Sequence, residues 1–155
     1  RWLTKYVLGN SQKVFFLISE NKKEKIKGHI GLANGLNKEN MIEIDNVLRG
    51  EKCFNKKLMT HALHDLISWT FISNSIKKLY LRVFLNNQKA IDYYENLNFV
   101  IKEQIPLKQN TDDSGNKIYS QAKKSEKTET YFSYMELSRN DHFENYKNIK
   151  LFNKN

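Results

Sequence analysis

The segment from residue 41 to residue 85 constrains the fold more than any other part of the chain, because two strand patterns enclose one helix pattern. Residues 41–48 and 79–85 alternate between apolar and polar side chains, which is typical of strands with one buried face. Residues 57–73 repeat apolar side chains at helical spacing. This order predicts a βαβ crossover, whose two strands lie parallel and whose connection is right-handed.

Further elements are predicted on both sides of this crossover. The expected order is strand, strand, strand, helix, strand, helix, strand, loop, strand, which is an α/β (α+β) fold with a mixed, mostly antiparallel sheet. Residues 109–130 are expected to form an unstructured loop because apolar residues are almost absent, and Pro106 is expected to stop the strand before it. The other predicted elements are strands at 14–18, 26–32, 99–107 and 131–137 and a helix at 90–97, capped by Asn86 or Asn87 and closed by Asn98.

Length and composition favour one folded domain, expected at residues 1–139. A polar tail is expected at residues 140–155, and it could form a helix that packs on the domain. The net charge is +9, but the lysines are scattered, so most of them are interpreted as solvated surface residues. The lone Cys53 excludes an internal disulfide framework and favours a cytoplasmic location. No apolar run approaches membrane-spanning length, so no membrane partner is expected.

The connection between the third strand and the long helix is a candidate phosphate site. Arg49 and Gly50 end the strand, and residues 49–57 contain four cations. The first N–H groups of a helix lack partners within the helix and carry a positive partial charge, so this end of a helix binds phosphate. On its own, however, this segment is better explained as a solvated turn.

Two motifs together resemble the GNAT family, the Gcn5-related N-acetyltransferases. The family's fourth strand and the loop after it read V-x-P-x-x-R/Q-G-x-G-x-G/A, and residues 44–50 match the first part, with Asn46 in place of proline. The later glycines of that loop are absent, and Lys52, Phe54 and Asn55 stand about there. Charge from lysine and a positive φ at Asn55 are expected to replace them.

The second motif is the family's later helix, which reads N-x-x-A-x-x-x-Y-x-x-x-G-F. Asn87, Ala90, Tyr94 and Phe99 fall on it in register, with Asn98 in place of glycine. The order of elements matches the family over roughly residues 14–137. The family's first strand and two helices are mostly missing before residue 14, so the domain is expected to be N-terminally incomplete.

The resemblance implies acetyl-CoA as the cosubstrate. The backbone of residues 44–48 would pair with the pantetheine amides like an added strand, and the amide at Val47 or nearby would polarise the thioester carbonyl. No metal is expected, since His61 and His64 lack a third ligand. The residues expected to bind the cosubstrate are Ile44, Asn46, Val47, Leu48, Arg49, Gly50, Lys52, Asn55, Lys56, Lys57, Asn87 and Ala90.

Acetylation of an amine needs a base for the ammonium proton and a proton donor for the leaving thiolate. Glu43 and Asp45 share one face of their strand, and either could serve as the base; Glu43 is preferred because it lies deeper in the strand. The resemblance makes Tyr94 the proton donor, with Tyr93 as the neighbour to be distinguished from it. The alternative interpretations are that Glu43 and Asp45 are merely exposed strand carboxylates and that Tyr94 is a tyrosine packed in the core.

The expected function is transfer of an acetyl group to a primary amine, such as an amino sugar nucleotide or another small amine, in a chain that could form a homodimer. His29 could line the acceptor site. The alternatives are a protein N-terminal acetyltransferase, a fold relative that has lost coenzyme binding, and a non-catalytic basic module that binds nucleic acid. The last rests on the charge of +9 and on Tyr119, Tyr131 and Phe132.

Overall fold

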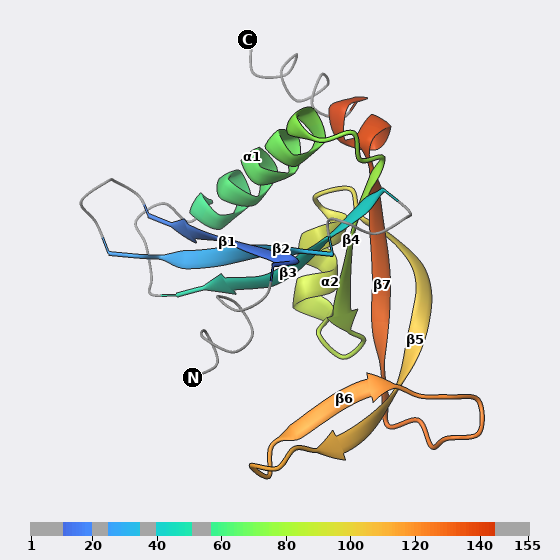
Figure 1. Cartoon of the computed structure of the whole chain (residues 1–155). Coiled ribbons are helices and arrows are strands. Elements are labelled where there is room, and N and C mark those ends of the chain that lie inside the picture. Colours follow the sequence, from blue (N-terminus) through green and yellow to red (C-terminus); the bar gives the residue numbers. More distant parts are fainter. Residues whose placement is uncertain (1–10, 20–24, 35–39, 51–56, 145–155) are drawn as a thin grey trace. The chain divides into compact units, whose positions relative to one another are not determined.

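The computed structural model describes residues 11–19, 25–34, 40–50 and 57–144 (Figure 1). Its strands form a seven-stranded mixed sheet in the order β1-β2-β3-β4-β7-β5-β6. The strands β3 and β4 pair parallel, whereas β1–β2, β2–β3, β5–β6 and β5–β7 pair antiparallel. The predicted α+β class with a mostly antiparallel sheet is therefore confirmed. The elements are β1 Lys13–Ile18, β2 Gly28–Ala33, β3 Met41–Arg49, α1 Leu58–Ser73, β4 Lys78–Phe84, α2 Gln88–Glu95, β5 Val100–Thr111, β6 Lys117–Gln121 and β7 Thr130–Ser138.

The chain divides into two compact units. Unit 1 consists of Arg1–Tyr80 and Leu137–Asn155, and unit 2 consists of Leu81–Glu136. Residues 139–144 are helical and belong to unit 1, whereas the rest of the expected tail lies outside the described residues. Unit 1 contains 18 Lys and Arg against 9 Asp and Glu, and unit 2 contains 8 against 8. The whole net charge of +9 therefore resides in unit 1.

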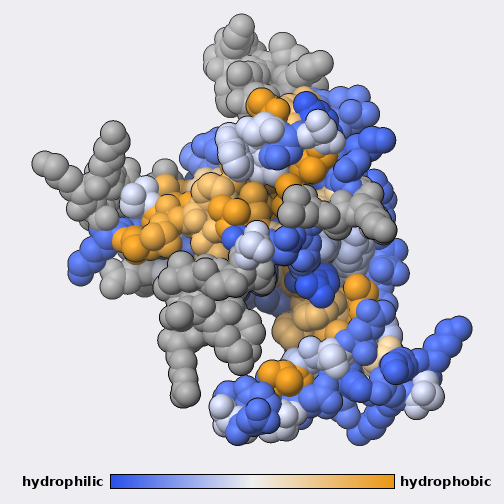
Figure 2. All heavy atoms as spheres, viewed as in Figure 1, coloured by the Kyte–Doolittle hydropathy of each residue, from blue (hydrophilic) through white to orange (hydrophobic). Residues whose placement is uncertain are grey.

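The helix α1 provides most of the helical core of unit 1. It spans Leu58–Ser73, within one residue of the predicted helix at 57–73. The apolar pattern Leu58, Ala62, Leu66 and Trp69 predicted a buried Trp69, and this is wrong, because Trp69 is 50% exposed. The buried face of the helix includes Ile67 and Phe71 instead. The centroid of the Trp69 ring lies 5.8 Å from that of the Phe16 ring in β1. Figure 2 shows the apolar side chains that gather over β1 and α1. The buried residues of the helix are Met59, Leu63, Leu66, Ile67, Thr70 and Phe71.

A β-bulge interrupts β3 near its middle. Gly31 of β2 is paired with Asp45, and His29 is paired with Leu48, so one residue of β2 stands opposite two residues of β3. Asn46, in the bulge, has a φ of 50°. This left-handed conformation is one that asparagine tolerates better than most residues, and it cannot be adopted by proline. The asparagine that departs from the family motif therefore has a structural role.

Glycines in β2 allow β3 to lie close on either side of this bulge. A Cβ atom on Gly31 would come within 2.8 Å of the Asp45 carbonyl oxygen, and one on Gly28 would come within 2.5 Å of the Leu48 carbonyl oxygen. Backbone atoms cannot give way as a flexible side chain can. The two glycines therefore fix the position of the bulged segment.

In unit 2, the prediction of an unstructured loop at residues 109–130 is wrong for residues 109–121, whereas residues 122–129 contain no helix or strand, as predicted. The strand β5 continues through Pro106 and forms a hairpin with β6. Pro106 removes one donor, but its carbonyl still accepts from the Ala122 backbone N–H at 2.8 Å. Asp112 closes the turn by accepting from two backbone N–H groups, those of Ser114 and Asn116. All five residues of β6 are exposed, so no alternation of apolar residues marked this strand.

The caps predicted for α2 are confirmed. The Asn87 side chain accepts from the Ala90 backbone N–H at 3.3 Å, and Asn98 has a φ of 67°. The Phe99 backbone N–H donates to the Tyr94 carbonyl at 3.0 Å, as in a Schellman motif. The helix that carries the second motif is thus defined at both ends.

Candidate functional site

The carboxyl end of β3 leads towards the start of α1, as the sequence predicted. Arg49 and Gly50 are exposed, and Lys57 occupies the N-cap of α1, whose first turn contains no acidic side chain. Basic charge therefore accompanies the positive end of the helix dipole. Lys52, Asn55 and Lys56 lie outside the described residues, as does Cys53.

The residues expected to pair with pantetheine follow the point at which β3 stops pairing with β4. The parallel ladder joins Met41–Glu43 of β3 to Lys78–Tyr80 of β4. In the following segment Ile44 is buried, Asp45, Asn46 and Val47 are partly exposed, and Leu48 is 56% exposed. The bulge lies in this segment, and a bulge leaves one residue outside the ladder.

Glu43 is buried and held by two neighbouring side chains. Glu43 is only 4% exposed, so the alternative interpretation of Glu43 as an exposed strand carboxylate is wrong. The Asn34 Nδ2 donates to Glu43 Oε2 at 2.8 Å, and the Tyr80 hydroxyl donates to the same oxygen at 3.4 Å. The Asn34 Nδ2 also lies 3.1 Å from the Tyr80 hydroxyl oxygen. These bonds fix the orientation of the carboxylate.

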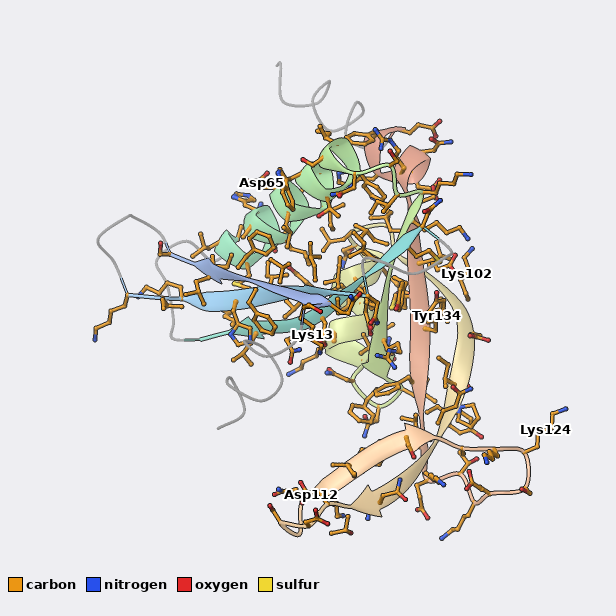
Figure 3. All side chains as sticks on the ribbon, in the orientation of Figure 1. Lys13, Asp65, Lys102, Asp112, Lys124 and Tyr134 are labelled. Carbon is orange, nitrogen blue, oxygen red and sulfur yellow. The ribbon has the colours of Figure 1, made fainter. Side chains whose placement is uncertain are left out.

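Asp45 occupies a different environment on the same face of β3. The Lys13 Nζ lies 2.7 Å from Asp45 Oδ2, and both side chains are about a quarter exposed. Figure 3 labels Lys13 over the strands of this sheet. An ammonium group so close neutralises the carboxylate and occupies one of its oxygens. Sequence reasoning ranked the two carboxylates almost equally, but the structure separates a buried, hydrogen-bonded one from an ion-paired one.

His29, which the sequence offered as an acceptor-site residue, lies in the same unit. Its ring centroid lies 5.6 Å from that of Phe15 in β1, and its side chain is partly exposed. Glu43, Asp45 and His29 thus all lie in unit 1, on the neighbouring strands β2 and β3.

The second motif lies in unit 2. Tyr94 is buried at 8% exposure, and its ring contacts those of Tyr93 and Phe99 with centroids 5.3 and 5.9 Å apart. This packing agrees with the core interpretation of Tyr94 and also orients its hydroxyl. Asn87 and Ala90 stand at the start of the same helix, where Asn87 is exposed.

A histidine cluster in unit 1 was missed by sequence reasoning. His142, in the short helix after β7, is 4% exposed, and its Nε2 is joined by a hydrogen bond of 2.8 Å to the Ser68 hydroxyl of α1. The His64 ring centroid lies 4.9 Å from that of His142, and Phe71 packs on the same ring at 5.7 Å. Burial, followed by repulsion from His64, lowers the pKa of His142 from 6.5 to about 4. A separation of 74 residues between Ser68 and His142 left no local signal of this contact.

The cluster predicts that the fold is destabilised by acid. The unfolded chain binds a proton at His142 below about pH 6.5, whereas the folded chain does so only near pH 4, so the contribution is complete above pH 6.5 and is lost as the pH falls towards 4. We expect the free energy of unfolding to fall by at most about 3 kcal/mol from this group. Urea unfolding at about pH 7 and pH 4.5 measures the loss.

The matched variants are His142→Gln, which cannot titrate, and His61→Gln, which removes an exposed histidine of α1. The His142 variant should lose about 2 kcal/mol less than the wild type over this pH interval, and the His61 variant should behave as the wild type. An equal loss in all three proteins would mean that other groups cause the acid destabilisation.

Neither a metal cluster nor a membrane span emerges from the part of the chain that the structure describes. No group of three or more His, Cys, Asp or Glu side chains there is placed to hold a metal ion. No described helix is both long and apolar enough to cross a membrane.

The fold and the two motifs define the class of protein. A bulged strand leads into a βαβ crossover, and the mixed sheet matches those of solved acetyltransferases. The sequence matches the "Acetyltransferase (GNAT) family" over residues 2–99, which is more than half of the chain and includes both motifs. The chain therefore belongs to the GNAT family, and the resemblance stated from the motifs is confirmed.

Solved structures show the same fold at low sequence identity. One is a probable acetyltransferase of the GNAT family from Chromobacterium violaceum, with a TM-score of 0.68, 12% identity, and coverage of 90% of this chain and 63% of that one. Another is spermidine N-acetyltransferase from Vibrio cholerae in complex with CoA and spermine, with a TM-score of 0.65, 15% identity, and coverage of 91% and 73%. A dodecameric structure of the Vibrio cholerae enzyme matches with a TM-score of 0.65, 14% identity, and coverage of 89% and 71%.

This chain spans only part of these relatives. It covers 61% and 63% of the first two matched structures. A comparison with curated proteins finds no match.

Proposed function

We propose that this chain transfers an acetyl group from acetyl-CoA to a primary amine. Family membership makes acetyl transfer the reaction to consider first, and one of the solved neighbours was crystallised with CoA and spermine. The observation that carries the proposal is the buried Glu43 carboxylate, which Asn34 and Tyr80 hold on the strand that begins the βαβ crossover. Burying a charge costs free energy. A carboxylate that is nevertheless buried and held in one orientation therefore indicates a functional role.

Acetyl-CoA is proposed to bind along β3, with its pyrophosphate at the start of α1. The bulge at Asn46 supports this proposal, because it takes backbone groups of β3 out of the ladder with β2 and makes them available to pantetheine amides and to the thioester carbonyl. Arg49 and Lys57 supply charge for the pyrophosphate. Asn87 is proposed to donate to the pantetheine arm from its Nδ2, since its Oδ1 caps α2.

The proposed reaction needs one base and one acid. Glu43 takes a proton from the substrate ammonium, directly or through water, and the free amine attacks the thioester carbonyl carbon. A C–N bond forms, the C–S bond breaks, and the departing sulfur takes the proton of the Tyr94 hydroxyl. The second proton lost by the attacking nitrogen returns through water to the Tyr94 phenolate, and Glu43 releases its proton to solvent. The products are the N-acetylated amine and CoA.

The acceptor is proposed to be a small amine, with an amino sugar nucleotide as the first class to test and a polyamine or a protein N-terminus as the alternatives. A panel of such amines, assayed by thiol release from acetyl-CoA, tests the proposal. We expect release above the background of hydrolysis with at least one small amine. Release with none of them, by a protein that is folded and binds acetyl-CoA, would contradict the proposed reaction.

The distribution of charge argues against the nucleic-acid-binding alternative. That alternative needs cations interleaved with the aromatic side chains Tyr119, Tyr131 and Phe132. All three lie in unit 2, which carries no net charge, whereas the excess of cations lies in unit 1. We also propose a cytoplasmic location and a homodimer, the latter in view of the dodecameric neighbour.

A further inference from the structure

A second cationic site lies in unit 1, away from the proposed acetyl-CoA site. A pocket of about 350 Å³ opens where β4 begins and β7 ends. None of the side chains that line it is acidic. They are Lys77, Lys78, Ser138, Arg139 and Asn140, which provide three cations, a hydroxyl and a carboxamide.

Hydrogen bonds hold the backbone at Lys77 and Arg139 and the guanidinium of Arg139. The Arg139 backbone N–H donates to the Lys77 carbonyl at 3.0 Å, and the Lys77 backbone N–H donates to the Asn40 carbonyl at 3.2 Å. The Arg139 guanidinium donates from Nη1 to the Phe71 carbonyl, near the end of α1, and this bond orients the whole side chain. A guanidinium has five N–H donors, so donors remain for a ligand. The cationic groups of Lys77 and Arg139 are thus carried by a preorganised backbone.

The carboxylate of Asp141, two residues after Arg139, is hydrogen-bonded to Ser138. The Ser138 hydroxyl donates to Asp141 Oδ2 at 2.6 Å, and the Asp141 backbone N–H donates to the same hydroxyl at 3.1 Å. The bond from the Asp141 backbone N–H to the Ser138 hydroxyl is an N-cap interaction at the start of the short helix after β7. The three cationic side chains that line the pocket therefore exceed this one carboxylate by two charges.

The pocket and the proposed pyrophosphate site lie at opposite ends of β3. Lys78 is paired with Met41 at the first residue of β3, and Arg49 is the last residue of the same strand. At a rise of ~3.3 Å per residue, the two ends are about 25 Å apart. One CoA pyrophosphate cannot occupy both sites, so any phosphate bound in the pocket is distinct from the CoA pyrophosphate.

We propose that this pocket binds a small molecule through a phosphomonoester or diphosphate group. Arginine and lysine together are the residues that recognise phosphate oxygens, by forked hydrogen bonds and by charge respectively. The volume lies within the range of small-molecule sites, and the cations surround one concave pocket instead of forming the extended stripe that a nucleic acid strand requires. The excess charge of unit 1 raises the local concentration of such anions.

The test is calorimetric titration of the full chain with inorganic pyrophosphate at about 0.1 M salt, carried out in an Arg49→Glu background. That background weakens any binding at the proposed acetyl-CoA site, so the two sites are separated. We expect pyrophosphate to bind, and to bind at least about tenfold more weakly when Lys77→Gln and Lys78→Gln are added. The matched control, Lys25→Gln with Lys27→Gln, removes the same charge from unit 1 and should retain binding.

A second variant keeps the test valid if the double substitution perturbs folding. Asn140→Asp places a negative charge in the lining of the pocket and is exposed, so the fold should tolerate it while binding is lost. Equal binding by the pocket variants and the control pair would overturn the proposal. An RNA oligonucleotide without terminal phosphates that displaces pyrophosphate from the pocket would also overturn it, in favour of a nucleic acid ligand. Inorganic phosphate and a nucleoside diphosphate, titrated in parallel, show which phosphate group fits.

Discussion

Replacing Glu43 by glutamine should lower turnover by about 10²- to 10⁴-fold near neutral pH. The substitution keeps the size of the side chain and an oxygen that accepts from Asn34 or Tyr80, but it removes the base. The loss should shrink as the pH rises, because the free amine is then abundant without a base. Turnover of the best amine from the panel, measured across pH together with the melting temperature, distinguishes lost chemistry from lost folding.

The matched control is Asp45→Asn on the same face of the same strand. It breaks the ion pair with Lys13, which is partly exposed and contributes about 1 kcal/mol or less, and it should leave turnover near the wild-type value. An active Glu43 variant beside an inactive Asp45 variant would identify Asp45 as the base. Full activity in both would mean that the amine arrives deprotonated or that another group serves.

The substitution Tyr94→Phe should lower turnover by roughly 10²-fold or more while the affinity for acetyl-CoA changes little. The ring and its packing against Tyr93 and Phe99 remain, and only the hydroxyl is lost. The hydrogen bond matters chiefly when charge develops on sulfur, so the effect should appear in kcat and much less in binding. Steady-state kinetics combined with calorimetry separates these two quantities.

Tyr93→Phe is the matched control for this prediction, and it should be almost silent. The two tyrosines are neighbours in α2, but only Tyr94 falls on the spacing with Asn87 and Ala90. If the Tyr93 variant were the impaired one, the register of the motif on this helix would be shifted by one residue. If neither variant were impaired, tyrosine would have no part in the mechanism.

The sequence predicted those parts of the fold that bury one face. The alternation at residues 41–48 and 79–85 and the helix between them identified β3, α1 and β4, because core packing leaves a periodic pattern. The same reasoning missed the β5–β6 hairpin, whose strand β6 is exposed throughout and is defined by backbone pairing and by the Asp112 turn. The division into two units left no signal in the sequence, because β4 and β7 each pass from one unit to the other without any break in composition.

For the candidate site, sequence reasoning found residue types but not their environments. It placed Glu43 and Asp45 on one face, but only the register of Ala33, Glu43 and Tyr80 across three strands brings Asn34 and Tyr80 to Glu43. In the sequence, the only sign of the bulge at Asn46 was that asparagine replaces the proline of the family motif. Contacts between residues distant in the sequence carry no local pattern, and for this reason His142 was not singled out.

Acetyl-CoA is proposed to bind at the end of β3 and the start of α1, and calorimetric titration of the chain with acetyl-CoA measures this binding. The wild-type chain should bind one acetyl-CoA, and Arg49→Glu should weaken binding at least about tenfold without lowering the melting temperature, because Arg49 is exposed and is proposed to contribute charge for the pyrophosphate. Lys25→Glu, an equal charge reversal in unit 1, should bind as the wild type does. The absence of binding by the wild type, or equal binding by the wild type and the Arg49 variant, would contradict the account.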